Sequence, residues 1–183
     1  MSEAHPPRLV AVLARVVRGW ALFGGIATCA LAVMTAGSAV SNLAFQRPFP
    51  ADYELVKHVV AVVIFSFLPY CQMSGANVTV DIFTEGMGTR WKAAMAFAAS
   101  LLAGAFALVL LRQMWLGWMS YMRFPEVTPV LGLPLWTAFP PILVSIVLLL
   151  AAAAATAAND WRVARGRAPW ALRADSGNAR DDG

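Results

Sequence analysis

The side chains best placed to do chemistry are a few ionisable groups at the edges of long apolar runs. Glu54 and Lys57 precede one charge-free run, and Arg112 follows another. Charged groups at such depths are costly in a bilayer and usually face protein or water. Counted along helices from the opposite ends of their runs, Glu54 and Arg112 both lie roughly 30 Å along. Two interpretations stay open. In the first, Glu54 and Arg112 pair, with Lys57 nearby, and hold the two spans together or bind a partner subunit. In the second, each side chain reaches separately to lipid headgroups.

A second group of charges lies in residues 76–90, a segment too polar to span a bilayer. Its apolar residues recur at helical spacing on one face, and its acids fall on another. The first face holds Val80, Phe83 and Met87, and the second holds Asp81 and Glu85. This pattern predicts a short amphipathic helix in the headgroup region, with Phe83 against lipid or a partner and Asp81 at the polar surface.

Motifs for catalysis or metal binding are missing from the sequence. Its two histidines are His5 and His58, whereas a metal site needs several converging ligands. No phosphate-binding glycine loop and no nucleophile motif occurs. Cys29 and Cys71 both lie in apolar runs, where free cysteine behaves as a small hydrophobic residue. We therefore expect no cofactor and no enzymatic activity.

The composition places the chain among membrane proteins. Of its 183 residues 60% are hydrophobic and only 13% charged, whereas a soluble domain carries roughly a quarter charged residues. The basic residues lie at the ends of apolar runs, and a nucleic-acid binder would gather them on one soluble face. We therefore expect the chain to lie in a lipid bilayer, and we do not expect it to bind nucleic acid.

Four apolar runs reach the roughly 20 residues that a helix needs to cross a bilayer. The predicted fold is an all-α membrane protein with four transmembrane helices and one interfacial helix between the second and third. The spans are expected at about residues 20–45, 52–73, 93–121 and 135–159. They form a membrane domain at 19–159, preceded by a basic lead at 1–18 that suits a surface helix and followed by a polar basic tail at 160–183. The first run also resembles a secretory signal, but signal cores are only about 7–15 residues long.

The basic residues predict the orientation. Four spans place both termini on one side of the membrane, and each basic residue can then be assigned a side. The terminal side holds Arg8, Arg15, Arg18, Arg90, Lys92, Arg162, Arg165, Arg167, Arg173 and Arg180; the other side holds Arg47 and Arg123, with Lys57 and Arg112 inside spans near it. This bias predicts cytoplasmic termini, because basic residues are enriched in cytoplasmic loops.

Prolines and glycines mark irregular points within the spans. Pro69 interrupts the second run, and Pro140 and Pro141 predict an irregular start to the fourth. Gly24 and Gly25 in the first run are interpreted as a notch for close helix packing.

Four short motifs follow one another along the chain. They are Pro48-Phe49-Pro50 with Asp52-Tyr53-Glu54-Leu55-Val56, Leu68-Pro69-Tyr70, Asn77-Val78-Thr79-Val80-Asp81, and Thr128-Pro129-Val130-Leu131-Gly132-Leu133-Pro134-Leu135-Trp136. With four spans and this length, the chain resembles the small permease subunit of tripartite ATP-independent periplasmic (TRAP) transporters, the DctQ type, over about residues 20–159. The family often has His where Asn77 stands, so no role is assigned to Asn77.

The resemblance implies a function in transport across the bacterial inner membrane. It implies that a large permease subunit, joined to this chain in a membrane heterodimer, moves the substrate with a sodium gradient. A periplasmic substrate-binding protein would deliver that substrate, typically an organic acid. Glu54, Pro69, Asp81 and Pro134 match recurring family positions, and the resemblance implies structural or interface roles for them.

Two other functions would need residues that the sequence supplies poorly. A small four-helix redox, haem-binding or quinone-binding subunit would be expected to carry paired histidine ligands, which His58 alone cannot supply. An autonomous transporter would need polar residues converging in mid-membrane, where the runs offer only Thr28, Ser66 and Ser100.

Overall fold

The computed structural model describes residues 6–46, 49, 52–74, 89–168 and 170. Within these ranges the regular secondary structure is all helical, and no β-strand occurs. The elements are α1 (Arg8–Phe45), α2 (Asp52–Ser74), α4 (Thr89–Arg123), the 3-10 helix η2 (Leu135–Ala138) and α5 (Phe139–Ala164). Four of these segments are long and apolar enough to cross a membrane, which confirms the predicted all-helical, four-span fold.

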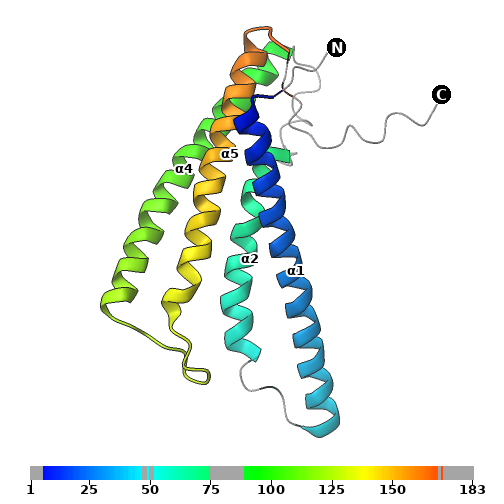
Figure 1. Ribbon diagram of the computed structural model, residues 1–183, viewed down its shortest axis with the longest axis vertical. Helices are drawn as coiled ribbons and strands as arrows, with labels where there is room; N and C mark the ends of the chain where they lie inside the picture. Colours follow the sequence, from blue (N-terminus) through cyan, green and yellow to red (C-terminus); the bar gives the residue numbers. More distant parts are fainter. Residues whose placement is uncertain (1–5, 47–48, 50–51, 75–88, 169, 171–183) are drawn as a thin grey trace, which may run out of the picture.

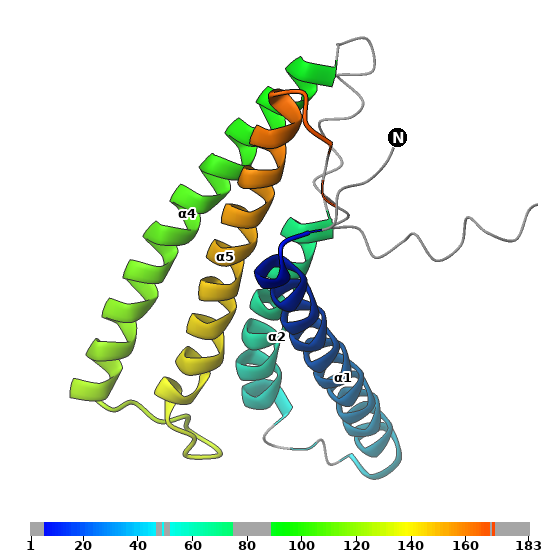
Figure 2. The ribbon, with the colours of Figure 1, turned by 45° about the horizontal axis from the view of Figure 1, so that its top comes forward.

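The helices lie side by side in the order α1, α2, α5, α4, so that α1 and α4 form opposite edges (Figure 1). The start of α1 and the end of α5 lie at the same end of the molecule, which we call the narrow end. At the other end, the wide end, the helices diverge, and the turned view in Figure 2 shows the same fan.

Two apolar clusters hold the fan together. The larger one joins α4 to α5 through Ala107, Ile142 and Ile146, with Phe65 of α2 packed against it. The smaller one lies nearer the narrow end and joins α1, α2 and α5 through Val17, Met73 and Ala152. Elsewhere many large apolar side chains are exposed, as expected for helices that face lipid or another membrane protein.

The first helix is longer than its predicted span. Residues 8–18, predicted as a separate basic lead, are the first turns of α1, which continues without interruption to Phe45. The reason is that Val17 belongs to the helical apolar pattern and is fully buried in the smaller cluster. A single glycine, Gly19, is not enough to end a helix whose pattern continues on both sides.

The prolines lie where irregularity was predicted. Pro140 and Pro141 occupy the first turn of α5, directly after η2, so the fourth span does begin irregularly. A proline is tolerated there because the first-turn amides of a helix have no partner within it. Pro69 lies inside α2 and is fully buried. The predicted interfacial helix lies outside the described residues, except that residues 89 and 90 belong to α4.

Candidate functional site

The loop between α4 and η2 is folded by its own hydrogen bonds at the wide end. The backbone N–H of Thr128 donates to the carbonyl of Leu133 at 2.9 Å, and the N–H of Leu133 donates to the hydroxyl of Thr128 at 3.0 Å. Val127 and Pro134 form an antiparallel bridge. Gly132 has φ +62°, in the left-handed region that glycine adopts without strain. These contacts make residues 127–134 a compact turn.

Glu54, in the first turn of α2, binds this turn through its carboxylate. Its two carboxylate oxygens accept hydrogen bonds from the backbone N–H groups of Val130 and Leu131, both at 2.9 Å. The Thr128 hydroxyl lies beside the same carboxylate. Consecutive backbone N–H groups that converge on one anion form a favourable binding nest. Glu54 retains only 9% of its accessible surface, so the turn covers most of the Glu54 side chain in this interaction, which we call the Glu54 latch.

The latch gives Glu54 other partners than Arg112, which one of the two interpretations of the sequence paired with it. In the described part of the chain no ion pair joins Glu54 to Arg112, because both carboxylate oxygens meet loop amides. Arg112 is exposed on α4. Lys57 is also exposed, and its ammonium group lies 4.1 Å from the ring centre of Tyr53 in a cation–π contact.

Three polar atoms near the wide end are buried without a hydrogen-bond partner in the described structure. They are Oδ1 of Asp52, Nε2 of His58 and Nε1 of Trp118. Asp52 and His58 lie within about one turn of Glu54 on α2. Buried polar atoms of this kind usually acquire a partner from water or protein, so this end of the molecule has unused capacity for hydrogen bonds.

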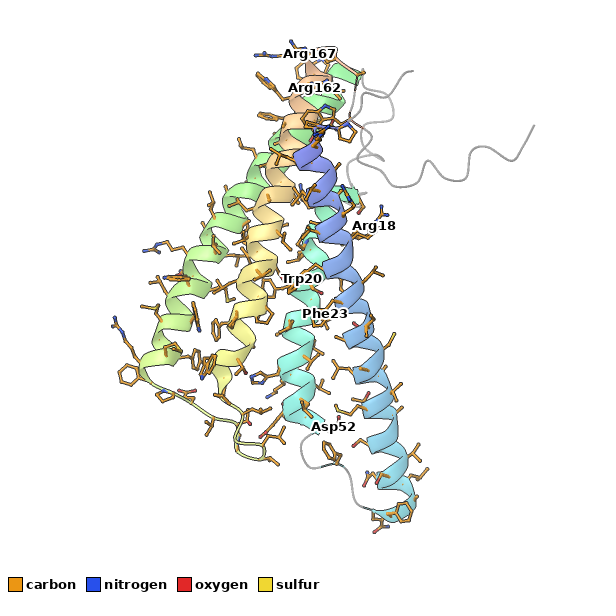
Figure 3. All side chains as sticks on the ribbon, in the orientation of Figure 1. Arg18, Trp20, Phe23, Asp52, Arg162 and Arg167 are labelled. Carbon is orange, nitrogen blue, oxygen red and sulfur yellow. The ribbon has the colours of Figure 1, made fainter. Side chains whose placement is uncertain are left out.

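Two pairs of polar side chains join neighbouring helices. Trp20 of α1 donates from Nε1 to the Ser145 hydroxyl of α5 at 2.8 Å (Figure 3 labels Trp20). Gln72 of α2 donates to Thr156 of α5 at 3.1 Å. Such bonds hold apolar helices together in a membrane, where burial of apolar surface gives little driving force.

Of the two adjacent glycines in α1, only Gly24 lies against another helix. A Cβ added at Gly24 would collide with the Ser66 hydroxyl of α2, whereas one added at Gly25 would meet open space. The notch predicted at this position is therefore confirmed for Gly24 alone.

The structure brings two of the seven predicted site residues together. Pro134 closes the turn that Glu54 holds. Pro69 is buried in α2 far along the chain from this site, and Lys57 and Arg112 are exposed. Asp81 and Phe83 lie outside the described residues.

Residues 30–163 match the family described as tripartite ATP-independent periplasmic transporters, DctQ component. The chain belongs to the DctQ family. No curated protein and no solved structure gave a match. The DctQ match confirms the resemblance deduced from the four motifs, and it gives no support to the redox or quinone-binding alternative.

The DctQ family identifies the chain as the small membrane component of a TRAP transporter. Both parts of the Glu54 latch lie inside the matched range and inside the motifs that carried the resemblance. The sequence marked residues 128–136 as a motif and implied a structural or interface role for Pro134, but it did not predict the contact with Glu54. The available signal was the spacing of Pro129, Gly132 and Pro134, which indicates a tight turn on the same side of the membrane as Glu54.

Proposed function

We propose that this chain is a scaffold subunit, which fixes a large permease subunit in the bilayer and carries no substrate itself. The proposal includes the absence of any catalytic activity. Transport would be performed by the large subunit, with which this chain would form a membrane heterodimer.

The observation that carries the proposal is how the buried polar groups are used. Both carboxylate oxygens of Glu54 bind its own loop, and Trp20, Gln72 and Ser145 bind neighbouring helices of the same chain. Transporter substrate sites are built differently, from interrupted helices whose polar groups converge on a midplane cavity. Helices whose polar side chains bind one another in this way suit a part that widens and orients its partner.

The exposed charges fit contacts outside the chain. Arg112 lies on an outer stretch of α4 with Leu108, Val109 and Leu116, all about half exposed or more. A charge in such a setting needs a headgroup or an acidic partner group. We propose Lys57, Arg112 and the segment at 76–90, with Asp81 and Phe83, as contacts to the large subunit or to headgroups.

The remaining details rest on the family. We propose sodium-coupled uptake of an organic acid, delivered by a periplasmic substrate-binding protein, in the bacterial inner membrane. The supporting argument is that this class of transporter divides delivery, movement and anchoring among separate chains.

Affinity purification of the tagged full-length chain from its native membranes tests the scaffold proposal. We expect one long, multi-span hydrophobic protein to co-purify in a fixed ratio near one to one. The matched control is the same chain carrying Arg123→Gln, an exposed change at the edge of the wide end, which should retain that partner. Recovery of the wild-type chain only with copies of itself would contradict the proposal.

A further inference from the structure

A shallow apolar groove lies between α4 and α5 near the narrow end. Its volume is about 230 Å³, and its lining residues are Phe97, Ala157, Ala158 and Trp161. The rings of Phe97 and Trp161 lie 5.2 Å apart, centre to centre, and form its aromatic wall. The two alanines leave space beside these rings, and all four side chains are apolar. The groove is therefore suited to a hydrocarbon chain.

Cationic groups lie directly beside this groove. The guanidinium of Arg165 lies 4.4 Å from the ring centre of Trp161, so a groove residue also supports a positive charge. The guanidinium of Arg162 lies 4.8 Å from the ring of Trp170. Its Nε–H is buried and has no acceptor among the described residues. Figure 3 shows Arg162 and Arg167 together at this end of the molecule.

The local charge balance favours an anion. The one acidic group of this turn of α5 is Asp160, whose carboxylate accepts a hydrogen bond from the Ser100 hydroxyl of α4 at 3.1 Å. Three arginines follow it within seven residues, at positions 162, 165 and 167. Arginine is also the side chain best suited to phosphate, because it presents several N–H donors in one plane.

We propose that this groove is a binding site for an anionic phospholipid, with an acyl chain against Trp161 and the phosphate at Arg165 and Arg162. The site lies at the end of a membrane span, where headgroup and hydrocarbon meet. A free phosphate would make no use of the apolar wall, and a zwitterionic lipid would leave the excess of arginine uncompensated.

Native mass spectrometry of the full-length chain in non-ionic detergent tests the site. The ligands are phosphatidylglycerol, phosphatidylcholine with the same acyl chains, and inorganic phosphate. Each basic residue near an anionic surface adds about fivefold to binding, so we expect phosphatidylglycerol to bind at least tenfold tighter than phosphatidylcholine. Arg165→Gln should weaken phosphatidylglycerol binding about fivefold, and Arg165→Lys should restore most of it.

Two further variants separate the apolar wall from the charge. Ala158→Phe fills the groove from an exposed position, and it should weaken phosphatidylglycerol binding without changing the net charge. Arg123→Gln removes an exposed arginine at the wide end and should leave binding unchanged. Lipid-free melting temperatures of all variants should agree within a few degrees. Equal binding of the two lipids, displacement of lipid by millimolar phosphate, or unchanged binding by Arg165→Gln would each overturn the proposal.

Discussion

Glu54 can lie largely covered because two backbone N–H groups of one turn bind its carboxylate. Both oxygens meet N–H groups of one turn, and hydrogen bonds to an ionised acceptor are stronger than bonds between neutral groups. In return, the carboxylate fixes the turn that leads into η2 and α5. The side chains of Phe124, Val127 and Val130 are then exposed at the wide end.

Replacing Glu54 by Gln should loosen this turn. The amide retains one acceptor oxygen but brings an NH₂ group against a loop N–H, so at least one bond is lost. We expect the melting temperature in detergent to fall by on the order of 5 °C. Arg112→Gln should change it by no more than about 2 °C, because Arg112 is exposed on α4.

The double variant decides between the latch and the ion pair. Because Glu54 and Arg112 have separate surroundings, their effects should add. If the double variant loses clearly less stability than the two single variants lose together, the two residues are coupled. That result would support the ion pair. In a double variant with Glu54→Gln and Thr128→Ala, the loss of stability should differ from the sum of the two single losses, because both residues hold the same turn.

The sequence placed Glu54 at a useful depth and offered Arg112 as one candidate partner, but it did not indicate the loop amides that Glu54 binds. Charged side chains are visible in a sequence, so Arg112 was the obvious candidate for a buried acid. Backbone N–H groups occur at nearly every position, and only folding of the turn at 127–134 aims two of them at one carboxylate. A donor of this kind can be inferred only after the turn itself has been built.

At the scale of the element, the contact between α1 and α2 depends on the absence of a side chain. Gly24 lies against Ser66, which is fully buried and donates its hydroxyl hydrogen to the carbonyl of Val63 at 2.7 Å. Close approach of backbones at small residues is a common way for membrane helices to associate. The neighbouring Gly25 makes no such approach and provides a matched comparison.

Gly24→Ala should destabilise the fold, and Gly25→Ala should not. The added methyl group at Gly24 collides with Ser66 and forces α1 away from α2, which typically costs about 1–3 kcal/mol. At Gly25 the methyl group meets open space and favours the helix slightly. Thermal unfolding in one detergent measures both. Equal stability of the two variants would show that the helices can adjust without cost.

Helix number and approximate bounds could be predicted because apolar length alone determines them. The start of the first helix was harder to predict, because one continuous helix holds both the basic residues of the lead and the apolar residues of the span. Residues 8–18 carry the basic charges of a lead, yet Val17 is buried and makes them part of α1. The interfacial helix at 76–90 stays a prediction, and Phe83→Asp tests it through loss of complex assembly, with a smaller effect from Glu85→Gln.

At the scale of the whole molecule, the two ends of the fan differ. The helical bundle begins and finishes at the narrow end, and the Glu54 latch lies at the wide end. Arg8 at the start of α1 and Ala164 at the end of α5 lie at the narrow end (Figure 1). Counting basic residues predicts that this end is cytoplasmic. The latch would then lie at the periplasmic face.

Reporter fusions measure this orientation. An enzyme active only in the periplasm should be inactive when fused after Arg180 and active when fused to a chain shortened after Phe124. A reporter active in cytoplasm only should give the opposite pattern. Periplasmic activity of the fusion after Arg180 would overturn the proposed orientation.

Transport in liposomes tests the scaffold claim most directly. The full-length chain alone and its complex purified from native membranes are reconstituted separately, and uptake of labelled organic acids is measured under an inward sodium gradient with the periplasmic binding protein outside. The account predicts uptake by the complex and none above empty liposomes by the chain alone, because Trp20, Gln72 and Glu54 already bind groups of the same chain. Substrate uptake by the isolated chain would contradict it.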